Sequence, residues 1–175
     1  MNEKLIAHTP IFDLVEKQDD RGIGFNPAGI NAPDWITIIV SKGDEFLMTN
    51  QLRYGLMHIC EEFVAGQVDK GENPLDTAVR ELKEETGIII HDKNEIQYLG
   101  NFAANPAFMN NHMHYFYVDL DKVSYEIGDT HFDEHESIVS YWKNKTKVIN
   151  NYIESHDSVF LAGALFLMNY NKINY

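Results

Sequence analysis

A helix with one acidic face constrains this chain more than any other feature of its sequence. Glu81, Glu84 and Glu85 are spaced so that an α-helix brings their three carboxylates to one face. Like charges destabilise a bare helix by roughly 0.2–0.5 kcal/mol per pair, and Arg80 can offset part of that repulsion. Hard divalent cations such as Mg²⁺ and Mn²⁺ prefer carboxylate oxygens, so this spacing is typical of a metal site. Glutamates are also common on solvated helices, and the spacing alone leaves both interpretations open.

The residues around this cluster indicate where the helix begins and ends. Asn73 is suited to cap the first turn, Pro74 to occupy the first helical position, and Gly87 to follow the last helical residue. The opposite face of the expected helix is apolar, which allows it to pack on a sheet. The apolar residues on that face are Leu75, Ala78, Val79 and Leu82.

The rest of the chain predicts a mixed β-sheet covered by helices, in one domain over residues 1–175. Residues 21–33 are rich in Gly, Asn and Pro and predict a loop. A second helix is expected over residues 158–170, with a short helix near residues 147–152. Strands are expected over residues 10–16, 35–41, 45–51, 62–65, 96–102, 112–120 and 137–142.

Charge and composition narrow the classes of function. The formal net charge is −13, and such an acidic surface repels nucleic acid. Bound cations can invert the charge of a local site, so a phosphorylated small molecule remains a suitable ligand. Cys60 is the only cysteine, which excludes an internal disulfide and suits the reducing cytoplasm. No apolar run reaches the roughly 18–20 residues of a membrane span, so no membrane association is expected.

The stretch from residue 66 to residue 88 resembles the Nudix box, the signature of the Nudix hydrolase family. The box reads G-x5-E-x7-R-E-U-x-E-E-x-G-U, where U is apolar, and this chain fills every defined position. A chance match in a chain of this length has a probability of roughly one in ten million from average residue usage. Gly66, Glu72 and Gly87 are structural positions of the box, and Glu72 is expected to support its loop. The matching residues are Gly66, Glu72, Arg80, Glu81, Leu82, Glu84, Glu85, Gly87 and Ile88.

The resemblance implies a fold and a site. Nudix domains are α/β/α sandwiches with a mixed sheet, in which the box forms a loop-helix-loop. Mg²⁺ or Mn²⁺ lies there between the helix carboxylates and the pyrophosphate of the substrate. By this resemblance, Glu81 and Glu85 are the principal metal ligands, and Glu84 adds a ligand or positions a water molecule. Arg80 is expected to orient the glutamates.

The residues before the box resemble the ADP-ribose pyrophosphatase branch of the family. Arg53 ends a Q-x-R pattern of that branch, and residues 62–66 match its E-x-P-A-G pattern except that Val64 replaces the proline. The resemblance implies that the carbonyl oxygen of Ala65 is a metal ligand and that Glu62 contacts substrate or metal. Arg53 is expected to bind the pyrophosphate as a charge-assisted donor. A surface arginine beside a strand is an equally good interpretation of Arg53.

A loop after the box offers further substrate contacts. Asn105, Pro106, Phe108 and Asn111 lie near the place where that branch carries a proline in a loop close to the terminal ribose or the adenine. Amide groups and an aromatic ring can bind a sugar or a base. An Asn-Pro turn explains the same residues nearly as well, so both interpretations stay open.

The general base of that branch lies in a loop well after the box, in a segment similar to residues 133–139 of this chain. Glu134 has the better register for this role, and Glu136 is the second candidate. A glutamate can take a proton from the attacking water when its surroundings tune its pKa. An acidic loop before a strand is an equally good interpretation of both residues.

The expected function is therefore Mg²⁺- or Mn²⁺-dependent cleavage of ADP-ribose or an ADP-sugar to AMP and a sugar phosphate. Other Nudix activities on UDP-sugars, GDP-sugars, dinucleotides or nucleotides stay open, as does a non-catalytic ADP-ribose sensor. The resemblance also implies a homodimer that involves the N-terminal residues 1–34. The pairs His112/His114 and His131/His135 have spacings found in zinc sites, but a strand and a loop, respectively, make zinc the weaker interpretation.

Overall fold

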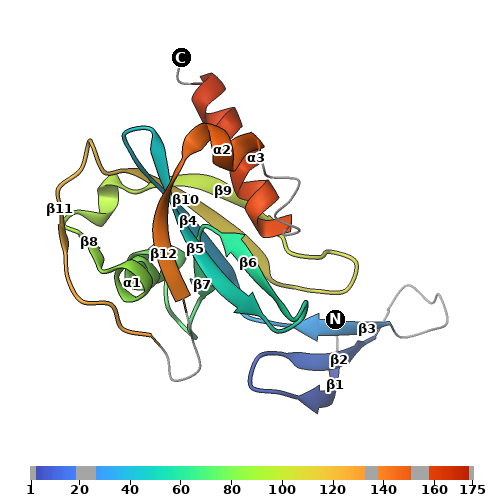
Figure 1. The fold of residues 1–175 in the computed structure, drawn as a ribbon. Coiled ribbons are helices and arrows are strands. Elements are labelled where there is room, and N and C mark those ends of the chain that lie inside the picture. The colour runs from blue at the N-terminus through green and yellow to red at the C-terminus, as the bar shows by residue number, and fades with distance from the viewer. Residues whose placement is uncertain (1–2, 19–26, 133–137, 151–157, 174–175) are drawn as a thin grey trace.

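A computed structural model describes residues 3–18, 27–132, 138–150 and 158–173 of the chain as an α/β/α sandwich (Figure 1). The helix α1 (Pro74–Thr86) covers one face of the central sheet. The helices α2 (Lys145–Asn150) and α3 (Ser158–Ile173) lie on the other face. The predicted fold class is confirmed. No helix in the described ranges is long and apolar enough to cross a membrane.

The central sheet is mixed, as the sequence predicts. Its strands follow the order β12-β5-β4-β10-β9, while β6 pairs with β5 and β7 pairs with β4. The neighbours β4 and β10 run parallel, and the other pairs run antiparallel. The strands are β4 (Trp35–Lys42), β5 (Glu45–Arg53), β6 (His58–Glu62), β7 (Val64–Gln67), β9 (Gln97–Ala103), β10 (His112–Asp119) and β12 (Ile138–Asn144).

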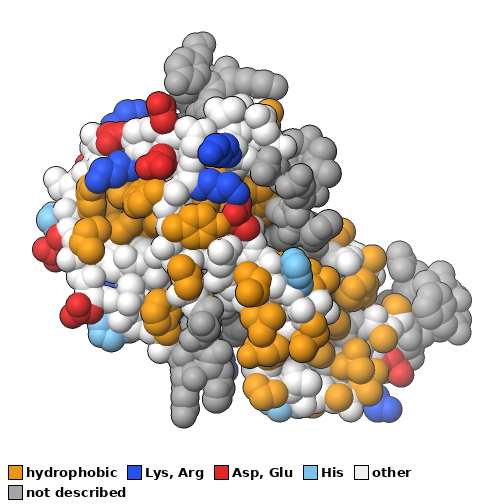
Figure 2. Space-filling view, viewed as in Figure 1, with side chains coloured by type: hydrophobic (Ala, Val, Ile, Leu, Met, Phe, Trp, Pro, Cys, Tyr) orange, Lys and Arg blue, Asp and Glu red, His pale blue; other side chains and the backbone are white. Residues whose placement is uncertain are grey.

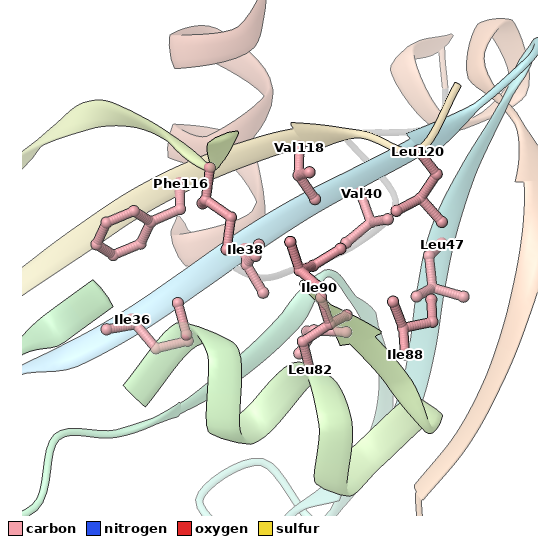
Figure 3. Packing of buried hydrophobic residues seen from close by; sticks show 13 residues of the cluster. Ile36, Ile38, Val40, Leu47, Leu82, Ile88, Ile90, Phe116, Val118 and Leu120 are labelled. Atoms are coloured by element: carbon pink, nitrogen blue, oxygen red, sulfur yellow. The ribbon is translucent and has the colours of Figure 1, made fainter. Parts of the chain in front are cut away.

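Two hydrophobic clusters hold the layers together, and β4 contributes to both. Successive side chains of a strand point to opposite faces, so β4 can pack against a helix on each side. Ile36 and Ile38 point toward α1, where they meet Leu82 (Figure 3). Ile39 belongs to the cluster on the other face with Phe160 of α3. These contacts fix α1, and with it the acidic residues on its other side, against the sheet.

The ends of α1 lie where the capping residues predict them. The side-chain oxygen of Asn73 accepts a hydrogen bond from the backbone N–H of Leu75 at 2.9 Å. Gly87 adopts a left-handed conformation with φ of 74°, and its N–H donates to the carbonyl oxygen of Lys83 at 2.8 Å. A side chain at residue 87 would also collide with the backbone of Gly128. The glycine is therefore required both for its dihedral angles and for its close packing.

The N-terminal region differs from the sequence prediction. The strands β1 (Glu3–His8), β2 (Asp13–Lys17) and β3 (Ala28–Asn31) form a separate antiparallel sheet. A single strand over 10–16 and a loop over 21–33 were expected, so the prediction misses β1 and β3. β3 is only four residues long and forms because it pairs with β2, a partner that its own sequence does not reveal.

Three short elements after the box were also not predicted. The strands β8 (Ile88–Ile90) and β11 (Tyr125–Ile127) pair with each other beside the C-terminal end of α1. A single turn of 3₁₀-helix, η1 (Lys93–Glu95), follows β8. Segments this short carry no periodic pattern of their own. η1 leads into β9, whereas β11 ends at Ile127, shortly before residues 129–132.

Candidate active site

A polar cavity of about 450 Å³ lies along α1. It brings together residues from β4, β5, β7, the loop before α1, α1 itself and the segment after β11. Several predicted site residues therefore meet in one place although they are far apart in the sequence. The residues that line the polar cavity are Trp35, Gln51, Arg53, Ala65, Gly66, Gln67, Asp69, Arg80, Glu81, Glu84 and His131.

Arg80 holds the acidic residues of the polar cavity in place. Its Nη1 donates to Glu81 Oε1 and to Glu84 Oε2, each at 2.9 Å. Its Nε and Nη2 donate to the two carboxylate oxygens of Glu72, both at 3.2 Å. Burial acts to lower the pKa of Arg80, but these carboxylates outweigh it and raise that pKa above its ordinary value. The planar guanidinium therefore stays charged and holds the carboxylates of Glu72, Glu81 and Glu84 together.

Gly66 allows Glu81 to lie against the sheet. A β-carbon at residue 66 would stand 2.1 Å from the carboxyl carbon of Glu81, so no other residue fits there without moving that side chain. On the far side of Arg80, the hydroxyl of Thr77 donates to Glu72 at 2.8 Å. The hydrogen bond from Arg80 is the main cause that lowers the pKa of Glu72 below its ordinary value. Glu72 thus remains an anion that anchors the loop.

The donor chemistry of the polar cavity fits a hard divalent cation. Glu81 and Glu84 offer carboxylate oxygen atoms at its wall, which Ala65 also lines, and Gly66 leaves the space that the Glu81 carboxylate fills. Glu85 is buried, with 4% of its surface exposed, and is not among the lining residues. Within the described residues, no three His, Cys, Asp or Glu side chains converge closely enough to hold an ion. Arg80 lies between two of the carboxylates instead.

A second cavity, of about 280 Å³, is mostly apolar and adjoins the first. The two cavities share Trp35, Arg53 and Ala65 as a common wall. Cys60 is buried and lines only the apolar cavity of the two. The residues that line the apolar cavity are Trp35, Arg53, Leu56, Cys60, Glu62, Ala65, Ala104, Met109, Asn111, Met113 and Val159.

Arg53 and Glu62 form an ion pair at the boundary of the two cavities. Arg53 Nε donates to Glu62 Oε1 at 2.8 Å, and Nη2 donates to Oε2. Glu62 is buried, whereas Arg53 is partly exposed and its guanidinium carbon lies 5.9 Å from the ring centre of Trp35. The pair presents a positioned guanidinium to both cavities.

The loop over residues 104–111 carries four predicted substrate contacts, and they do not all lie at a cavity. Asn111 lines the apolar cavity, whereas Asn105, Pro106 and Phe108 are absent from the lining of both cavities. The side chain of Asn105 instead accepts a hydrogen bond from the backbone of Ala107 at 3.3 Å, as in an Asn-Pro turn. Of the four residues, only Asn111 is brought to the candidate site.

Residues 128–131 precede the predicted general base and are hydrogen-bonded to α1 and to Gly87, which follows it. The N–H of Gly128 donates to the carbonyl oxygen of Gly87 at 2.8 Å, and that of His131 donates to the carbonyl oxygen of Glu84 at 2.9 Å. His131 thereby reaches the polar cavity, a position that its sequence neighbours did not indicate. Glu134, Glu136 and His135 lie outside the described residues.

The other histidine pair makes contacts that account for it without a metal. His114 Nε2 lies 3.1 Å from Asp34 Oδ2, and the backbone N–H of His112 donates to Asp34 Oδ1 at 2.7 Å. Asp34 lies directly before β4, so these contacts join the start of β10 to the start of β4.

Comparison with known proteins gives matches over most of the chain. A family model described as the NUDIX domain matches residues 31–159. An ADP-ribose pyrophosphatase of Bacillus subtilis (strain 168) is 31% identical over 97 residues, which are 55% of this chain and 51% of that protein. One from Saccharomyces cerevisiae is 35% identical over 80 residues, 46% of this chain and 33% of that protein.

A methanol dehydrogenase activator of Bacillus methanolicus is 35% identical over 77 residues, which are 44% of this chain and 40% of that protein. The matches thus span only about a third to a half of the length of these three curated relatives. A crystal structure of an ADP compounds hydrolase superposes with a TM-score of 0.74 at 16% identity, over 99% of this chain and 94% of that one. That likeness concerns the fold.

Proposed function

The chain belongs to the Nudix family, and on that basis we propose that it is a divalent-cation-dependent hydrolase of a pyrophosphate bond. The observation that carries the proposal is the polar cavity, where Arg80 holds Glu81 and Glu84 beside the space left by Gly66. An acidic wall alone would repel a pyrophosphate, so a cation is needed to reverse the local charge.

The cation site is proposed at the carbonyl oxygen of Ala65 and the carboxylates of Glu81, Glu84 and Glu85. A bound Mg²⁺ or Mn²⁺ would supply positive charge to the pyrophosphate and make the attacking water more acidic. Arg80 keeps two of these carboxylates from turning away into solvent. It also reduces their mutual repulsion, which favours the arrangement before substrate arrives.

The chain supplies further groups that bind and orient the substrate. Arg53 presents its guanidinium to both cavities and is proposed to donate to a phosphate oxygen. Trp35 forms the wall between them and helps to exclude water from the cleaved bond. Glu134, with Glu136 as the alternative, is proposed to take the proton of the attacking water.

We propose ADP-ribose or an ADP-sugar as the substrate, with AMP and a sugar phosphate as products. A polar cavity that shares a wall with an apolar one suits a molecule with a charged pyrophosphate and a planar base. Two of the relatives are ADP-ribose pyrophosphatases, which supports the same choice.

A homodimer is part of the proposal because the N-terminal sheet exposes apolar side chains. The exposed apolar residues of this region are Leu5, Ile6, Ile11 and Phe12. Figure 2 shows hydrophobic side chains gathered over this part of the surface. Exposed apolar patches of this kind mark interaction sites, and a second copy of the chain is the proposed partner.

A substrate panel tests the proposal. ADP-ribose, UDP-glucose and dATP are incubated with Mg²⁺, with Mn²⁺ and with a chelator, and the products are separated by chromatography. We expect AMP and ribose phosphate from ADP-ribose, only when a cation is present, at a rate above that for the other two. A protein that binds ADP-ribose but cleaves none of the three would be a sensor rather than an enzyme.

A further inference from the structure

His131 lies at the polar cavity, and the proposed function gives it no role. The residue follows β11, is exposed, and lines the cavity together with Glu81 and Glu84. Its ring makes no hydrogen bond and no ion pair with another residue that the structure describes. An exposed polar ring at the wall of a cavity is open to a molecule bound there.

The segment that carries His131 is held against the C-terminal end of α1 (Figure 1). β11 pairs with β8, and the next residue, Gly128, donates its N–H to the carbonyl oxygen of Gly87 at 2.8 Å. A β-carbon on Gly87 would collide with the carbonyl oxygen of Gly128, so this approach needs a glycine. Three residues later, the N–H of His131 donates to the carbonyl oxygen of Glu84 at 2.9 Å. The backbone of residue 131 is therefore fixed beside the acidic face of α1.

The wall of the polar cavity carries more carboxylates than cations. Among the described residues that line it, Asp69, Glu81 and Glu84 supply three negative charges, and Arg53 and Arg80 supply two positive ones. Both guanidinium groups already donate to carboxylates of the protein. A pyrophosphate in this cavity therefore needs, besides a cation, hydrogen-bond donors that no carboxylate holds.

The ring of His131 can supply such a donor. Imidazole carries one N–H in each of its neutral tautomers, so it can donate to a phosphate oxygen without taking up a proton. A hydrogen bond to a charged oxygen is about twice as strong as one between neutral groups. Because the backbone of residue 131 is already held, only the side-chain torsions have to be ordered when the contact forms.

We propose that His131 is a substrate-binding residue whose imidazole N–H donates to a non-bridging oxygen of the pyrophosphate. This inference rests on the proposed function, because that function takes the pyrophosphate to lie in the polar cavity. The contact forms when the substrate binds and persists during cleavage. Its removal should therefore raise KM and leave kcat nearly unchanged.

The test measures binding of an ADP-ribose analogue with a methylene bridge between its two phosphorus atoms, by calorimetry with Mg²⁺ present. The bridge resists hydrolysis, so affinity is measured without turnover. His131→Ala should bind the analogue roughly 10-fold or more weakly, because a hydrogen bond to a charged group is lost. His131→Gln keeps an N–H donor and should recover part of the affinity. Wild-type affinity in His131→Ala, a glutamine variant no better than alanine, or no binding by the wild type would each overturn the inference.

His91 provides the matched control. It is also an exposed histidine, and its backbone N–H also donates to a distant residue, the carbonyl oxygen of Ser124 at 3.1 Å, but it lines neither cavity. His91→Ala should bind the analogue as the wild type does. An equal loss in His91→Ala and His131→Ala would mean that the site is not involved, and the inference would be wrong.

A second measurement separates contact with the phosphate from an effect through Glu84, whose carbonyl oxygen accepts from His131. Binding of Mn²⁺ without any nucleotide is followed by electron paramagnetic resonance. His131→Ala should bind Mn²⁺ as the wild type does. A loss of Mn²⁺ affinity as large as the loss of analogue affinity would show that His131 acts on the cation site, and would overturn the proposed contact.

These measurements do not depend on hydrolysis. A protein that cleaves no substrate but binds the analogue through His131 would contradict the proposed enzymatic function and support the contact. A protein that cleaves ADP-ribose, and whose His131→Ala variant binds the analogue normally, would support the enzyme and contradict the role of His131.

Discussion

The carboxyl group of Glu81 lies directly against the α-carbon of Gly66, so close that a β-carbon on residue 66 would be 2.1 Å from it. Two residues that are 15 positions apart in the Nudix box are thus in contact across the junction of β7 and α1. The small residue in the strand lets the carboxylate of the helix reach the polar cavity. This contact explains the need for a glycine at residue 66 of this chain.

Gly66→Ala should therefore lower turnover while the fold survives. The added methyl group meets the end of a flexible side chain, which can move away, and the displaced Glu81 leaves its position. A misplacement of about 1 Å can reduce turnover by roughly 10²-fold. Steady-state kinetics measures the loss. Gly55→Ala, where a β-carbon meets nothing within 4 Å, is the control and should behave as the wild type. Full activity in Gly66→Ala would mean that Glu81 does not act from this position.

Glu72 should contribute stability that is lost in acid. Arg80 lowers the pKa of Glu72 in the folded protein, so the folded state favours the charged carboxylate. Its contribution is fully present above the pKa of an unfolded glutamate, about 4.3, and is lost as the pH falls through the lower folded value. Urea unfolding should show Glu72→Gln less stable than the wild type at pH 7, with a smaller gap at pH 3.5. A gap of the same size at both pH values would contradict this assignment.

The elements that the sequence predicts well are those with local signals. The capping by Asn73 and the left-handed Gly87 involve only neighbouring residues, so the ends of α1 follow from the chain alone. The buried strand β4 is recognisable from its apolar run. β3 could not be predicted, because its four residues form a strand only by pairing with β2 and by contact between Ile30 and Met109.

In the candidate site, too, local spacing can be predicted from the sequence, whereas contacts between distant segments cannot. The spacing predicts that Glu81, Glu84 and Glu85 share one helix face, but only Glu81 and Glu84 line the polar cavity, whereas Glu85 is buried. The approach of His131 to the polar cavity depends on hydrogen bonds to α1 from a segment more than 40 residues later. No pattern within the sequence near His131 reports such a contact. The burial of Asn111 depends in the same way on Pro33, from a distant part of the chain.

Mutation can identify the general base that takes the proton of the attacking water. Glu134→Gln should lower kcat by roughly 10²–10⁴-fold with little change in KM, because a general base acts on the chemical step. Glu136→Gln is the matched variant two residues away and should retain most of the activity. The reverse order would assign the role to Glu136. Near-normal kcat in both variants would remove this segment from the mechanism.

The N-terminal sheet should form the interface of a dimer. Leu5 and Ile6 are each more than half exposed, and burying them against a second copy would stabilise the pair. Sedimentation of the wild type at micromolar concentration should show a dimer, and the double change Leu5→Lys with Ile6→Lys should yield monomers. Ile127→Lys, at an exposed apolar residue of β11, should leave the dimer intact. Detection of monomer alone in the wild type would contradict the proposed assembly.

The most direct test of the account is the rate of Mg²⁺-dependent ADP-ribose hydrolysis by the wild type and by Glu85→Gln. Glutamine has nearly the same shape, so the buried residue should still pack and the circular dichroism spectrum should be unchanged. Loss of a carboxylate that is proposed to hold the cation should reduce turnover by roughly 10²-fold or more, since a bound cation would supply several kcal/mol to the reaction. A folded Glu85→Gln protein with near-normal turnover would contradict the claim that this acidic helix holds the cation for catalysis.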